Sequence, residues 1–118
     1  MSALEPQAIR LAVGQARKLI FTLDQTPAGS VSGWTMRFRM RRPGGTTLVE
    51  KTTGSGIACT DGTAGVWEVT LLDTDTTDSD KLAGRAGLYD WAFWRTDDGS
   101  ETPLAYGTCE VYRTAETG

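Results

Sequence analysis

The chain has 118 residues, a formal net charge of −3 and no histidine. This length is typical of one domain spanning 1–118, with a core over about 7–113 and short arms at both ends. The absence of histidine excludes catalytic triads built on that residue and the usual mixed histidine and cysteine zinc sites. The negative net charge gives no general attraction to nucleic acid or to anionic membranes.

Alternation of apolar and polar side chains predicts four strands in the first half of the chain. Residues 7–13 and 17–24 each place apolar side chains at every second position, and Gly14 separates the two. The alternation is strongest over 34–41, which we interpret as a half-buried strand. We expect it to form a hairpin with 47–52, closed by a loop of four or five residues. The apolar face of this strand carries Trp34, Met36, Phe38 and Met40, and its polar face carries Thr35, Arg37, Arg39 and Arg41.

The second half of the chain continues the same pattern. Further strands are expected over residues 57–60, 66–72, 87–95 and about 103–113. The acidic connection 73–80 offers several helix N-caps, so we expect at most one short helical turn near 76–83. Short strands at roughly ten-residue spacing, with turn residues between them, predict an all-β fold, an antiparallel β-sandwich of about seven to nine strands.

Aromatic residues indicate where the core of this sandwich lies. Tyr89, Trp91 and Phe93 recur at every second position, which places three rings on one face of a strand. Each such side chain buries roughly 150–250 Å². The predicted core anchors are Trp34, Phe38, Trp67, Tyr89, Trp91 and Phe93.

No residue pattern points to catalysis, and we expect no catalytic residue, metal or cofactor. The four aspartates of 73–80 could offer oxygens to calcium, but they lack the ligand order of an EF-hand, and we favour a solvated, capped loop. Asp90, faced by Glu68 or Glu110 from a neighbouring strand, could form the paired carboxylates of a glycosidase. We favour these acids as outward partners of Arg37, Arg39 and Arg41 across the sheet.

The cysteines and the N-terminus bear on where the protein is made. Cys59 and Cys109 each lie in an apolar strand pattern, so we favour two buried free thiols over a disulfide. The first residues show no basic segment followed by an apolar run, and no stretch approaches the ~20 apolar residues of a membrane span. We therefore expect synthesis in the cytoplasm without a signal peptide.

The arginine row of 34–41 has two interpretations. It is either the solvated face of an antiparallel strand or an interface, because the planar guanidinium of arginine makes bidentate contacts and is enriched where proteins meet. Trp94 falls on the side of its strand opposite Tyr89, Trp91 and Phe93, so it either packs in another layer or is exposed to a partner. The candidate interface residues are Arg37, Arg39, Arg41, Trp94 and Arg95.

Four segments, taken in order, carry a resemblance to a known family. They read GWTMRFRMR at 33–41, GVWEVTL at 65–71 running into DTDT at 73–76, GLYDW at 87–91 and LAYGTCEV at 104–111. Their order and spacing over about 7–113 resemble β-sandwich domains of tailed-phage structural proteins, represented by the N-terminal domain of the phage upper baseplate protein. The fold that this resemblance implies is a sandwich of the Ig-like or baseplate type.

The resemblance also implies a function. It points to a non-enzymatic structural or assembly protein of a phage or prophage virion, in the tail, baseplate or connector region. Its partners would be copies of itself, as a homo-oligomer within the assembly, and neighbouring virion proteins, with neither nucleic acid nor membrane. The alternative is a small carbohydrate-binding module, because four tryptophans on a β-sandwich could stack on sugar rings.

Overall fold

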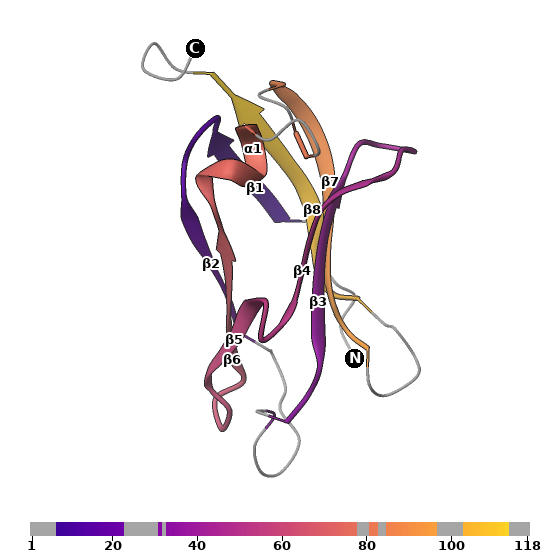
Figure 1. Cartoon of the computed structure of the whole chain (residues 1–118). Helices are drawn as coiled ribbons and strands as arrows, with labels where there is room; N and C mark the ends of the chain where they lie inside the picture. Colours follow the sequence, from indigo (N-terminus) through magenta and orange to yellow (C-terminus); the bar gives the residue numbers. More distant parts are fainter. Residues whose placement is uncertain are drawn as a thin grey trace.

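The computed structural model describes residues 7–22, 31, 33–77, 81–82, 85–96 and 103–113. Figure 1 shows two layers, with β2, β5 and β6 on one side, β3, β4, β7 and β8 on the other, and α1 at one end. The elements of the described part are β1 (Gln7–Ala12), β2 (Arg17–Thr22), β3 (Met36–Arg41), β4 (Thr47–Thr53), β5 (Gly56–Asp61), β6 (Val66–Leu71), α1 (Asp73–Thr77), β7 (Gly87–Arg95) and β8 (Pro103–Tyr112).

Hydrogen bonding runs through the strands in the order β1-β8-β7-β3-β4-β5-β6-β2. The two layers meet at a corner where β4 pairs with β5 at two positions, Thr52 with Gly56 and Thr53 with Ile57. The predicted all-β sandwich is confirmed, and the eight strands found among the described residues lie within the expected range. Most pairs are antiparallel, but β1 lies parallel to β8 and β4 lies parallel to β5.

The hairpin predicted from the arginine-rich strand is present. β3 and β4 pair antiparallel, and residues 42–46 form the loop between them, with Gly44 at a φ of 71°. β3 begins at Met36, so Trp34 precedes the strand in which it was expected. β2 ends at Thr22, and positions 23 and 24 of the expected strand lie outside the described residues.

The helical turn lies earlier than the predicted window of 76–83. α1 begins at Asp73, one residue after the end of β6, because the carboxylate of Asp75 accepts a hydrogen bond from the Leu72 N–H at 2.8 Å and closes the chain into a turn there. The hydroxyl of Thr76 then accepts a bond from the Gly14 N–H at 2.7 Å. The helix is therefore fixed both to its own first turn and to the connection between β1 and β2.

Aromatic rings from both layers form the centre of the core. Phe21 of β2 stacks on Phe93 of β7 with 4.7 Å between ring centroids, and lies 5.4 Å from the ring of Trp91. Phe38 and Trp67 are fully buried. Contacts of this kind contribute about 0.5–1.5 kcal/mol each beyond the area that they bury. Of the predicted core anchors, Trp34 alone is only partly buried, because it lies before β3 at the end of the sandwich.

Tyr89 gives the sandwich an immunoglobulin-like feature. Its hydroxyl donates a hydrogen bond to the carbonyl of Arg85 at 2.8 Å, which is the tyrosine corner found where the next-to-last strand of such domains begins. In antibody domains a cysteine stands two residues later and joins the two sheets. Here that position is Trp91, and its contact with Phe21 spans the layers instead.

The edge strand β1 is held very close to β8. Gln7 lies opposite Gly107, and a Cβ added to Gly107 would come within 1.7 Å of the Gln7 carbonyl oxygen. A residue with a side chain would therefore force the two strands apart.

No helix in the described part of the chain is long and apolar enough to cross a bilayer.

Candidate functional site

The outer face of the layer containing β3, β7 and β8 brings together most of the predicted interface residues. Pairing between β3 and β7 sets Arg37 opposite Trp94, Arg39 opposite Ala92 and Arg41 opposite Asp90. Inward residues on both strands are buried, so these outward residues form one continuous surface. We call this surface, made by the six residues named here, the arginine face.

One carboxylate serves two guanidinium groups of the arginine face. Glu50 of β4 places Oε2 3.0 Å from Nε of Arg39, and its Oε1 lies 3.4 Å from Nε of Arg37. Within the described residues, Arg41 forms no ion pair, and its side chain is exposed. The row therefore holds more positive charge than its neighbours on the sheet neutralise.

The prediction that Glu68 and Glu110 pair with the arginine row was wrong. Glu68 lies 3.3 Å from Nζ of Lys18, and Glu110 lies 2.8 Å from Nε of Arg10. Both acids sit on strands that are not neighbours of β3, since β6 pairs with β2 and β5, and β8 with β7 and β1. Asp90 does lie opposite Arg41 on the adjacent strand, but no ion pair joins the two side chains.

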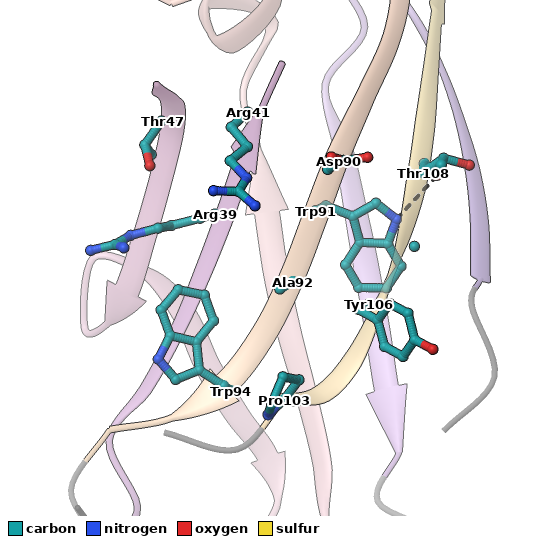
Figure 2. A pocket seen from close by; sticks show the side chains of 11 residues that line it. Arg39, Arg41, Thr47, Asp90, Trp91, Ala92, Trp94, Pro103, Tyr106 and Thr108 are labelled. Atoms are coloured by element: carbon teal, nitrogen blue, oxygen red, sulfur yellow. Dashed lines mark hydrogen bonds between the residues drawn. The ribbon is translucent and has the colours of Figure 1, made fainter. Parts of the chain in front are cut away.

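A shallow hollow of about 490 Å³ opens on the arginine face. Figure 2 shows Arg39 and Arg41 on one side of Ala92, with Tyr106 and Thr108 on the other. Trp91 belongs to the core but also lines the hollow, where its Nε1–H donates to the Thr108 carbonyl at 3.1 Å. The lining residues are Arg39, Arg41, Thr47, Asp90, Trp91, Ala92, Trp94, Pro103, Tyr106, Gly107 and Thr108.

Guanidinium groups cover several of the aromatic rings near the surface. The guanidinium of Arg39 lies over the Trp94 ring at 5.3 Å, and that of Arg95 lies over the Trp34 ring at 4.0 Å. Such stacks are worth about 0.5–1 kcal/mol at exposed sites. Arg95 follows Trp94 in the strand, so alternation directs it to the other side of the sheet. The five candidate interface residues therefore separate into four on the arginine face and Arg95 with Trp34.

The positions of the four tryptophans determine which indole rings a sugar could stack on. Trp67 and Trp91 are buried, and Trp34 has a guanidinium against its ring. Trp94 is the tryptophan that borders the hollow from the outer face, and it too carries a guanidinium. A sugar would have to displace Arg39 to reach this face of the Trp94 ring.

The acidic connection after β6 contains a buried ionic cluster rather than an open carboxylate site. Oxygens of Asp75 lie 2.9 Å from Nζ of Lys51 and 2.7 Å from Nζ of Lys81. Burial opposes ionisation of Asp75, but hydrogen bonds from both lysines and from the Leu72 N–H outweigh it and lower its pKa. No group of three potential metal ligands occurs among the described residues, and positions 78 and 80 lie outside them.

The two cysteines carry free thiols in different surroundings. Cys109 is buried, as expected, and burial raises its pKa to about 11. Cys59 is only half-buried, contrary to the expectation for both, because β5 lies at the corner of the sandwich. Burial also raises the pKa of Cys59. Neither thiol has the lowered pKa that activates a cysteine nucleophile.

Comparisons with known proteins add a limited likeness of structure. No family model matches the sequence, and no curated protein matches it. The NK cell receptor NKp44, described as a triggering partner in natural cytotoxicity, aligns with a TM-score of 0.47 and 14% identity, over 93% of this chain and 99% of that chain. The ZIG-8–RIG-5 IG1–IG1 heterodimer aligns with a TM-score of 0.42 and 12% identity, over 92% of this chain and 83% of that chain. What these proteins bind does not transfer to this chain at such levels of identity.

Proposed function

We propose that this protein is a non-enzymatic assembly subunit that acts through the arginine face, within a phage or prophage virion. The observation that carries the interface is the meeting of Arg39, Arg41 and Trp94 on one open sheet face around a hollow. Arginine and tryptophan are among the residues enriched where proteins meet, and here they lie on the strands of a sheet. The virion context is supported by the sequence resemblance to tailed-phage β-sandwich domains.

A substitution at the centre of the arginine face tests the interface. Ala92 is half-buried between the arginines and Tyr106, so Ala92→Arg would add a bulky charge there without entering the core. The matched control is Ala58→Arg, because Ala58 is exposed on β5 in the other layer. Light scattering coupled to size exclusion, over a range of concentrations, measures the mass of each protein.

We expect the parent protein and Ala58→Arg to form the same oligomer and Ala92→Arg to shift toward the 12.7 kDa monomer. A parent that stays monomeric at every concentration, or equal behaviour of the two variants, would contradict self-assembly through this face.

The proposed virion context is tested separately. In particles purified from the source, the protein should co-sediment with the particle, and its absence there would contradict that part of the proposal.

Fewer observations support the alternative function, carbohydrate binding. Trp94 and Tyr106 border a hollow that also contains polar groups, which is the chemistry that sugar binding requires. Titration with a panel of soluble polysaccharides, followed by tryptophan fluorescence, tests it. A change that is absent in Trp94→Phe would support sugar binding at the hollow, and a silent trace across the panel would exclude it for those sugars.

A further inference from the structure

We propose that the partner of the arginine face is an acidic peptide segment of a neighbouring subunit in the assembly, bound in extended conformation along β3. This inference rests on the proposed function, because it names the chemistry of the partner that the face receives. The segment would carry acidic side chains at alternate positions and an apolar side chain beyond them.

Charge is the first argument for an acidic segment. Three guanidinium groups share this face with the carboxylates of Glu50 and Asp90, in a chain whose net charge is −3. Arg41 is exposed and has no ion pair among the described residues, so it can receive a carboxylate from outside. A polyanion such as nucleic acid fits less well, because the acidic remainder of the chain would repel it.

Spacing is the second argument. Arg39 and Arg41 are two positions apart on one strand, which separates them by about 6.5–7 Å along its axis. Alternate side chains of an extended peptide have the same separation. Carboxylates at positions i and i+2 of such a peptide can therefore meet both guanidinium groups together, whereas adjacent carboxylates would point to opposite sides.

The hollow provides the apolar part of the site. Beyond Arg39, the face continues to Trp94, with Pro103 beside it on β8. An apolar side chain two positions from the acidic pair would reach this end of the hollow. Asp90 lies opposite Arg41, so it repels an incoming carboxylate on its own side and directs it toward the β4 side.

The test uses three labelled peptides of equal length, each acetylated and amidated. The first reads Leu-Ser-Glu-Ser-Glu-Ser-Leu, with a leucine at each end so that either direction can bind. The second replaces both glutamates by lysine, and the third, Leu-Ser-Ser-Glu-Glu-Ser-Leu, keeps the charge but loses the alternate spacing. Fluorescence anisotropy measures binding to the parent protein and to Arg41→Gln. The control variant is Arg10→Gln, which removes an exposed arginine that does not line the hollow.

We expect the first peptide to bind, the adjacent-glutamate peptide to bind about threefold more weakly, and the lysine peptide not to bind. Loss of one exposed charge pair in Arg41→Gln should weaken the first peptide about three- to fivefold, and Arg10→Gln should leave it unchanged. Equal binding of the lysine peptide, or equal loss in both variants, would overturn the proposal. If Ala92→Arg disrupts assembly while no acidic peptide binds, the acidic partner is excluded but the interface is not.

Discussion

Two ionic clusters in this molecule have the same arrangement of charges but differ in burial. In each, one carboxylate joins two cations, Asp75 with two lysines and Glu50 with two arginines. The side chain of Asp75 is 1% exposed, whereas that of Glu50 is 39% exposed. A buried carboxylate depends on its partners because water cannot replace them, while an exposed one exchanges partners at little cost. The comparison separates a cluster that maintains the fold from one that is available for binding.

The largest effect should follow from removing the buried carboxylate. In Asp75→Ala, the ammonium of Lys51, whose side chain is 9% exposed, loses its partner, and the Leu72 N–H loses its acceptor. We expect the free energy of unfolding to fall by about 3 kcal/mol. Urea denaturation followed by tryptophan fluorescence measures it. A loss below about 1 kcal/mol, the range of exposed pairs, would show that the two clusters do not differ.

Lowering the pH should have the second largest effect on stability, again through the buried cluster of Asp75. The pKa of Asp75 is lowered in the folded protein, so its stabilising contribution is present above the unfolded value of about 3.9 and is lost as the pH falls through the lower folded value. We expect the stability of the parent to decline below about pH 4 more steeply than that of Asp75→Asn. Urea denaturation at several pH values provides the measurement. A profile for Asp75→Asn that matches the parent would contradict the assignment.

The smallest effect on stability should come from the exposed cluster. Glu50→Gln removes the charge that Arg37 and Arg39 share, and we expect it to change the free energy of unfolding by less than about 1 kcal/mol. The same change frees two guanidinium groups for a partner. Binding of the alternate-glutamate peptide should therefore strengthen about two- to fivefold. Weaker binding would mean that Glu50 positions the arginines rather than competing for them.

Much of the fold could be predicted because alternation encodes which face of a strand is buried. Phe38, Trp67 and Phe93 are buried as their spacing indicated, and the hairpin of β3 and β4 joins segments adjacent in sequence. The parallel placement of β1 beside β8 could not be read in this way, because it joins opposite ends of the chain. No local pattern specifies such a pairing.

The candidate site was predicted in part for the same reason. Arg39 and Trp94 could each be placed on an outward face, but their meeting depends on β3 lying next to β7. The choice of Glu68 and Glu110 as partners failed because it needed the strand order. Glu50 could have been found from the predicted hairpin alone, since it lies opposite Arg39 there. The position of Arg95 followed from alternation and was missed.

The contact between Phe21 and Trp91 also determines how the domain responds to its chemical surroundings. Because two rings span the layers where antibody domains have a bond between sulfurs, the thiol–disulfide potential does not enter the folding equilibrium through this junction. The domain therefore needs no oxidant to complete its fold. Reduced glutathione should therefore leave its unfolding transition in place, and the sandwich can mature under reducing conditions.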